Sequence, residues 1–116
     1  MYQLIQHKNL NIEKWARYPK SQQVLMIANE LNRAKNWIKE DSLPEVNNCY
    51  ERALELTDLT TADLKWPRKA KREIRRFREM LAEQYMVPKK NADINTCLYN
   101  LLLQTTPEAW NMLNAR

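Results

Sequence analysis

Apolar residues recur at the spacing of an α-helix along most of the chain. In residues 21–40 the apolar positions are separated by three, four, three and four residues: Val24, Ile27, Leu31, Ala34 and Ile38. This period places them on one face of a helix. One-sided stripes of the same kind occupy residues 43–59, 67–86 and 92–104, and shorter helical stretches lie at residues 11–17 and 107–114. The pattern therefore predicts four main helices with a short capping helix at each end.

Proline and capping residues mark where these helices begin and end. Ser21 is a candidate N-cap of the second helix, and Ser42 with Glu45 has the spacing of a capping box for the third. Residues 60–63 predict a polar break after the third helix, and Pro67 opens the fourth, since proline is tolerated in a first turn. Connections of about two to seven residues favour antiparallel neighbours.

The chain contains no glycine, although average usage would give about eight in this length. Tight hairpin turns depend on glycine, so a sheet protein would be hard to build from this sequence. We therefore expect an all-α fold in which residues 1–116 form a single domain, an up-down bundle of four main helices. A chain of 116 residues is long enough to bury a core without disulfide or metal staples.

The two cysteines, Cys49 and Cys97, each lie on an apolar stripe. The fifth helix is predicted to bury Cys97 together with Ile94 and three leucines. Free cysteine is a common core residue, so we expect two reduced core thiols, with a disulfide as the less favoured alternative.

The positive charge of the chain is concentrated in one segment. Residues 65–78 hold eight cations against the single acid Glu73, whereas the rest of the chain holds eleven cations and thirteen acids. At about 100° per residue, one face of this helix collects most of the cations. The predicted polyanion-binding residues are Lys65, Trp66, Arg68, Lys69, Arg72, Arg75 and Arg76.

Such a helix favours a polyanionic partner. Repulsion among cations at i, i+3 and i+4 costs about a few tenths of a kcal/mol per pair, and cations near a helix N-terminus oppose the macrodipole. Folding alone does not require this arrangement. Arginine suits bidentate recognition of phosphate, and Trp66 is placed to stack on a base. We therefore expect RNA or DNA as the partner, with an acidic protein as an alternative.

Internal neutralisation of the basic helix is the competing interpretation. The third helix is acidic and can lie beside it, through Glu45, Glu51, Glu55 and Asp58. In that case the cations are paired within the fold, or they form an ordinary solvated face. Trp66, taken alone, is more typical of a core residue than of a stacking platform.

Part of the chain has a partial resemblance to a known repeat family. The positions that carry it are Ala34, Trp37, Tyr50, Ala53, Leu54 and Leu56. The last four are spaced as in the aromatic-x-x-Ala-Leu-x-Leu pattern of a tetratricopeptide second helix. Residues 30–58 therefore resemble a single tetratricopeptide-like hairpin, although Val46 and Asp58 replace that family's alanine and closing proline. Because such repeats need about three stacked copies to bury a continuous core, the resemblance implies an antiparallel helical hairpin and not a peptide-binding groove.

The C-terminal third is apolar and supplies a second functional hypothesis. Tyr99, Trp110 and Leu113 form a candidate interaction surface for a protein partner or for a second copy of the chain. In this hypothesis the chain is a helical adaptor or a homodimer whose basic face is paired internally.

Catalytic and metal-binding motifs are absent from the sequence. His7 is the single histidine, and no Cys-x-x-Cys, His-x-x-x-His or Glu-x-x-His spacing occurs. We therefore expect a non-catalytic module without cofactor or metal.

No stretch reaches the roughly 18 apolar residues of a membrane span, and the N-terminus lacks the apolar region of a signal peptide. We expect a cytoplasmic protein with no membrane partner.

Overall fold

A computed structural model describes residues 10–106, and within this range it contains five α-helices and no strand. The helices are α1 (Ile12–Ala16), α2 (Lys20–Lys39), α3 (Leu43–Ala62), α4 (Arg68–Met86) and α5 (Ala92–Leu103). The predicted all-α class is confirmed. The short helix expected at residues 107–114 lies outside the described residues.

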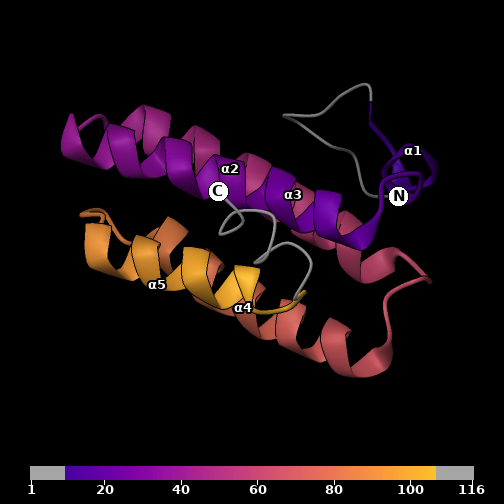
Figure 1. Cartoon of the computed structure of the whole chain (residues 1–116). Helices are drawn as coiled ribbons and strands as arrows, with labels where there is room; N and C mark the ends of the chain where they lie inside the picture. The colour runs from indigo at the N-terminus through magenta and orange to yellow at the C-terminus, as the bar shows by residue number, and fades with distance from the viewer. Residues whose placement is uncertain (1–9, 107–116) are drawn as a thin grey trace, which may run out of the picture.

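The four long helices form a closed ring of neighbours. α2 packs against α3 and α5, and α4 packs against the same two helices. Figure 1 shows two layers, with α2 and α3 in one and α4 and α5 in the other. Consecutive helices are antiparallel, so α2 and α4 run in the same direction and begin at the same end of the bundle. The predicted up-down arrangement is therefore confirmed.

Each long helix contributes an apolar face to one shared core. Trp15, Tyr50 and Phe77 are its largest fully buried side chains. The predicted stripe of α2 lies in this core, with Ile38 half-buried at its margin; the fully buried members are Val24, Ile27, Leu31 and Ala34. The period of three and four residues therefore identified the buried face of this helix correctly.

The helix starts differ from the capping prediction. α2 begins at Lys20 with Pro19 as its N-cap, so Ser21 lies inside the first turn and the prediction that it caps the helix was wrong. The ring of Pro19 fixes φ at −62°, which sets the entry of the chain into the helix without a hydroxyl cap. Ser42 is the N-cap of α3 as predicted, but its side chain makes no capping hydrogen bond.

α3 continues to Ala62, through the segment predicted to be a polar break. The Thr57 hydroxyl donates to the carbonyl of Ala53 (2.6 Å), and the Thr60 hydroxyl donates to the carbonyl of Leu56 (2.8 Å). These bonds satisfy the hydroxyls inside the helix. The polar residues here are therefore accommodated within α3 and do not end it.

α5 is rotated from the predicted orientation, although Leu98 and Leu102 are buried as predicted. Its buried positions include Asn95, Leu98 and Leu102, whereas Ile94 is 37% exposed and Cys97 is exposed. The prediction that Ile94 and Cys97 are core residues was therefore wrong. Both cysteines are free thiols, as expected, but only one of them is buried.

A buried amide explains this rotation of α5. Asn95 accepts a hydrogen bond from the hydroxyl of Tyr50 (2.8 Å) and donates to the carbonyl of Leu31 in α2 (2.9 Å). Buried polar groups are stable only when they are hydrogen-bonded. Asn95 is bonded in this way, so it can occupy a core position that an apolar pattern assigns to a hydrophobic residue.

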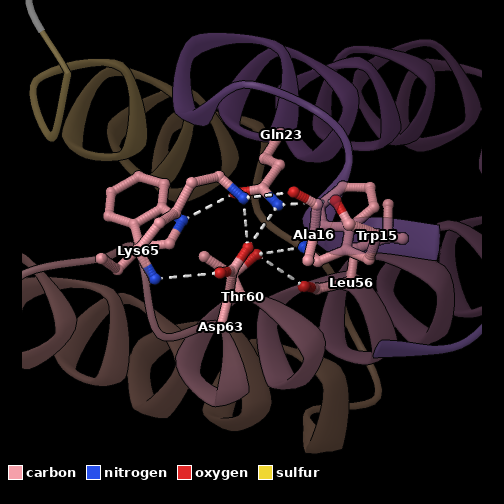
Figure 2. A network of polar contacts seen from close by, with 8 residues as sticks. Trp15, Ala16, Gln23, Leu56, Thr60, Asp63 and Lys65 are labelled. Atoms are coloured by element: carbon pink, nitrogen blue, oxygen red, sulfur yellow. Dashed lines mark hydrogen bonds and ion pairs between the residues drawn. The ribbon is translucent and has the colours of Figure 1, made fainter. Parts of the chain in front are cut away.

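A polar network ties the start of α2 to the end of α3 and to the connection that leads into α4 (Figure 2). We call it the polar joint; its members are Trp15, Gln23, Thr60, Asp63, Lys65 and Trp66. The Gln23 amide donates to the carbonyl of Trp15 (2.8 Å) and to Asp63 Oδ2 (2.9 Å), and it accepts the indole N–H of Trp66 (2.6 Å). These bonds hold the connection in place two residues before α4 begins.

Candidate nucleic-acid interface

α4 has an apolar inner face and a cationic outer face. Ile74, Phe77 and Leu81 are buried in the core. Since a helix turns about 100° per residue, the cations at intermediate positions lie on the opposite side. We call five of them the basic face, and all are exposed: Arg68, Lys69, Arg72, Arg75 and Arg76.

Within residues 10–106, the side chains of the basic face make no ion pair and no hydrogen bond. Arg78, at the margin of this face, behaves differently. Its Nε and Nη2 atoms donate to the two carboxylate oxygens of Asp58 in α3 (2.5 and 3.3 Å). The basic face therefore remains open toward solvent while its neighbour is held by α3.

The acids of α3 are directed elsewhere. Glu51 accepts a hydrogen bond from the hydroxyl of Tyr85 (3.0 Å), and Glu55 is buried with 5% of its surface exposed. Among the described residues, no ion pair or hydrogen bond joins Glu51, Glu55 or Asp58 to Arg72, Arg75 or Arg76. Internal neutralisation by α3 therefore applies to Arg78 and does not reach the basic face.

Acidic residues limit how far the positive surface extends along α4. Glu79 and Glu83 are exposed in the second half of the helix, on the same side as Arg72. Glu73 is exposed at the flank. The positive charge is therefore concentrated in the first half of α4, which is the half beside the polar joint.

Two residues of the predicted binding set belong to the polar joint. Trp66 is 3% exposed and its indole N–H is bonded to Gln23, so no ring face is open to a base. Trp66 is therefore a core residue and not a stacking platform. Lys65 forms an ion pair with Asp63 and donates to the carbonyl of Ala16 (2.9 Å), so its ammonium is already engaged.

Two further cations lie at this end of the bundle and were missing from the predicted set. Arg17 and Lys20 are both exposed, on either side of the turn between α1 and α2. The ammonium of Lys20 lies 5.9 Å from the centroid of the Trp66 ring. The sequence contained a signal for them, the run Arg-Tyr-Pro-Lys at residues 17–20, but only the fold brings this run next to the start of α4.

The interaction surface predicted in the C-terminal third is described only in part. Tyr99 is half-buried and packs against the core. Trp110 and Leu113 lie outside the described residues.

In the described range, the two buried groups Cys49 and Tyr50 are not activated as nucleophiles. Burial raises the pKa of the Cys49 thiol, although Arg52 Nη2 lies 3.3 Å from its sulfur and opposes this effect. Burial also raises the pKa of Tyr50 to about 12. Both groups therefore keep their protons at neutral pH, and the guanidinium of Arg52 is bonded to Glu30 (2.9 Å).

Other kinds of site have less support. A hollow of about 390 Å³ lies between the α2–α3 and α4–α5 connections, but the ammonium of Lys90 beside it is bonded to three backbone carbonyls. A second hollow of about 250 Å³ lies beside Asn95, whose amide is already bonded.

In the described part of the chain, no group of three His, Cys, Asp or Glu side chains is placed to hold a metal ion. None of the described helices is both long and apolar enough to cross a membrane.

Comparisons with known proteins add no relative to this picture. The chain matches no family model, no curated protein and no solved structure. The tetratricopeptide resemblance therefore stays a prediction. The structure does contain α2 and α3 as an antiparallel pair, with Ala34 buried and Trp37 39% exposed.

Proposed function

We propose that this protein is a non-catalytic module that binds nucleic acid through the basic face of α4. The observation that carries the proposal is that five exposed cations stand on one rigid helix without partners in the described structure. Ile74, Phe77 and Leu81 anchor that helix in the core. The cations are therefore presented at fixed spacings along the helix.

The energetic cost of the arrangement supports a role outside folding. Like charges three and four residues apart repel one another by about a few tenths of a kcal/mol per pair. Their position near the N-terminus of α4 adds a further unfavourable term, because the helix dipole is positive there. A phosphate backbone removes both penalties when it binds, since it brings negative charge to the same place.

The chemistry of the face indicates how the ligand is recognised. Four of its five members are arginine, and a planar guanidinium can bind phosphate oxygens through two parallel hydrogen bonds. Contacts of this type fix position and carry little sequence information. We therefore expect weak sequence preference. With about four phosphates neutralised, log K should fall against log salt with a slope of about −3 to −4.

The test is a charge reversal with a matched control. Arg72→Glu combined with Arg75→Glu should weaken binding of a fluorescent oligonucleotide by at least about tenfold and reduce the salt slope by about 2. The control is Lys35→Glu combined with Lys39→Glu. It makes the same change in net charge on exposed positions of α2, near the opposite end of the bundle.

Two results would contradict the proposal. One is binding that does not depend on salt. The other is an equal loss of affinity in both double variants, because this would mean that net charge matters and the basic face does not. A folded state should be verified for each variant by circular dichroism.

The assembly hypothesis requires a different measurement. Its candidate residues Trp110 and Leu113 lie beyond the described range, and Tyr99 is half-buried. Light scattering on the full chain and on a chain ending at Thr105 tests it directly. A dimer that becomes a monomer on truncation favours assembly through the C-terminal residues, and a monomer in both cases removes self-assembly by this tail.

A further inference from the structure

We propose that Tyr18, at the end of the bundle where the basic face begins, is a base-stacking residue, and that the ligand is therefore a single-stranded nucleic acid. This inference rests on the proposed function and adds the class of ligand to it. The sequence pointed to Trp66 for this role, but Trp66 is buried. Tyr18 is an aromatic side chain at the same end of the bundle and it is 38% exposed.

The Tyr18 ring is supported from the inside. It packs against the ring of Trp15 with centroids 5.7 Å apart and planes inclined by 59°. Trp15 is fully buried, and its indole N–H donates to the Thr60 hydroxyl in α3 (3.0 Å). The tyrosine ring therefore leans on a fixed neighbour while more than a third of the residue stays accessible.

The backbone of this turn is also constrained. The Tyr18 N–H donates to the carbonyl of Trp15 (3.1 Å). Pro19 follows, and a residue before proline is restricted to extended conformations. α2 begins directly afterwards at Lys20. A side chain on such a turn loses little conformational freedom when a base stacks on it, because its backbone is already fixed.

Two exposed cations flank Tyr18 along the chain, and two contacts link this segment to the connection that leads into α4. Arg17 and Lys20 are its exposed neighbours along the chain. Lys65 donates to the carbonyl of Ala16 (2.9 Å), which holds the connection into α4 against the end of α1 (Figure 2). The ammonium of Lys20 lies 5.9 Å from the Trp66 ring, and Trp66 is two residues before Arg68, where the basic face starts.

The spacing suits a short strand of nucleotides. Tyr18 and Lys20 are two residues apart, which is at most ~7 Å of chain. The Lys20 side chain then reaches Trp66, and two more residues lead to Arg68. Proteins that bind single strands combine aromatic platforms with a basic groove over sites of about 4–16 nucleotides. Of the acids described near Tyr18, Asp63 is paired with Lys65 and Glu13 is exposed.

The combination of residues favours a single strand over a duplex. In a duplex the bases stack on one another, so an aromatic side chain at the protein surface meets only the sugar-phosphate backbone. In a single strand a base can leave the stack and lie on the ring, and every base offers a π-face. Tyr18 is therefore expected to contribute to single-strand affinity and to leave duplex affinity unchanged.

The experiment measures binding of the full chain by fluorescence anisotropy to a 12-nucleotide single strand and to the corresponding duplex. Tyr18→Ala should lower the single-strand affinity by about tenfold, the effect of losing one stacked base, and should not change the duplex affinity. Tyr18→Phe keeps the ring and should bind within about twofold of the unchanged chain. Trp37→Ala is the matched control, since Trp37 is 39% exposed near the far end of α2, and it should have no effect.

The outcomes separate this inference from the proposed function. If Tyr18→Ala binds the single strand normally while Arg72→Glu with Arg75→Glu does not, stacking is overturned and the role of the basic face stands. If Tyr18→Ala weakens binding of the single strand and of the duplex equally, the substitution acts on folding or on the positions of the cations. Stacking is again overturned. If the unchanged chain binds neither oligonucleotide, or prefers anionic phospholipid vesicles to both, the two proposals fail together.

Discussion

The side-chain amide of Gln23 makes three hydrogen bonds within the polar joint. It donates to Trp15 and Asp63 and accepts from Trp66, so it contacts two segments that are about 40 residues away in sequence, at separations of 40 and 43. A network of this kind stabilises one arrangement only when every member is bonded. Gln23 is therefore the residue on which the attachment of the α3–α4 connection depends most.

Replacing this amide by an apolar group of similar size tests that role. Gln23→Leu leaves the Trp66 indole N–H without its partner, and an unsatisfied buried group costs about 1–3 kcal/mol. It also removes the bonds to the Trp15 carbonyl and to Asp63, which keep Tyr18 and Lys65 as partners, and each lost bond contributes about 1 kcal/mol. We expect the free energy of unfolding to fall by about 3 kcal/mol in urea denaturation. Gln22→Leu is the control, since Gln22 is exposed on the same helix and should change stability by less than about 0.5 kcal/mol. Equal effects of the two changes would show that the bonds of Gln23 are unimportant.

Single residues also show where prediction from the sequence succeeded and failed. The apolar stripe of α2 was predicted correctly because its buried face is built from side chains that alternate with polar ones at helical period. Asn95 was missed because a hydropathy pattern treats an amide as an outward-facing group. Its burial depends on Tyr50 and Leu31, which come from other helices. The exposure of Ile94 and Cys97 follows from that missed residue.

At the level of elements, the end of α4 is held by a lysine. The Lys90 ammonium donates to the carbonyls of Gln84 (2.8 Å), Tyr85 (2.7 Å) and Val87 (2.6 Å). The last carbonyls of a helix have no partner within it, and a cation there also complements the helix dipole. Lys90 thus supplies a cap that many helices obtain from a glycine, a residue that this chain lacks.

Loss of this cap should affect the end of α4 first. Lys90→Met keeps the length of the side chain but removes its three donors, and we expect a loss of about 1–2 kcal/mol in the free energy of unfolding. Amide hydrogen exchange should accelerate in the last turn of α4 and remain unchanged around Ile74. Lys89→Met, at an exposed neighbouring position, should neither lower the free energy of unfolding nor accelerate exchange in the last turn of α4. Uniform acceleration over the whole helix would contradict a local capping role.

The elements themselves were easier to predict than their ends. Long stripes with clear punctuation identified all four main helices, since helix formation depends on one continuous apolar face. The ends depend on individual polar contacts. The threonines at the end of α3 bond backward to carbonyls, and Pro19 replaces the expected serine cap. The open state of the basic face was likewise beyond prediction, because it depends on how α3 is rotated against α4.

On the scale of the whole molecule, the carboxylate of Asp63 links three parts of the fold. It accepts from Gln23 in α2 (2.9 Å) and pairs with Lys65, which in turn holds the end of α1. The backbone N–H of the same residue donates to the carbonyl of Thr60 (3.1 Å) and closes the end of α3. Burial by itself raises the pKa of this carboxyl, but the hydrogen bonds from Lys65 and Gln23 outweigh burial. The pKa of Asp63 therefore lies below its usual value.

This shift predicts how stability depends on pH. A carboxyl with a lowered pKa in the folded state adds stability above its unfolded pKa of about 3.9, and that contribution disappears as pH falls through the folded value. Asp63→Asn should be less stable than the unchanged chain by about 2 kcal/mol at pH 7, and the difference should narrow below about pH 4. Asp93→Asn, at an exposed position, is the control. A difference that stays constant down to pH 2 in thermal unfolding would show that the Asp63 charge has no such role.

The two buried tryptophans of the polar joint have an optical consequence. Trp15 and Trp66 have their indole N–H groups bonded inside the protein, Trp37 is partly exposed, and Trp110 lies outside the described residues. Trp66 is two residues before the first arginine of the basic face. A buried indole fluoresces at a different wavelength from an indole in water, and it is less accessible to quenchers in solution. The protein thus carries its own spectroscopic probe where the basic face begins, so that its association with unlabelled oligonucleotides can be followed without attaching a dye.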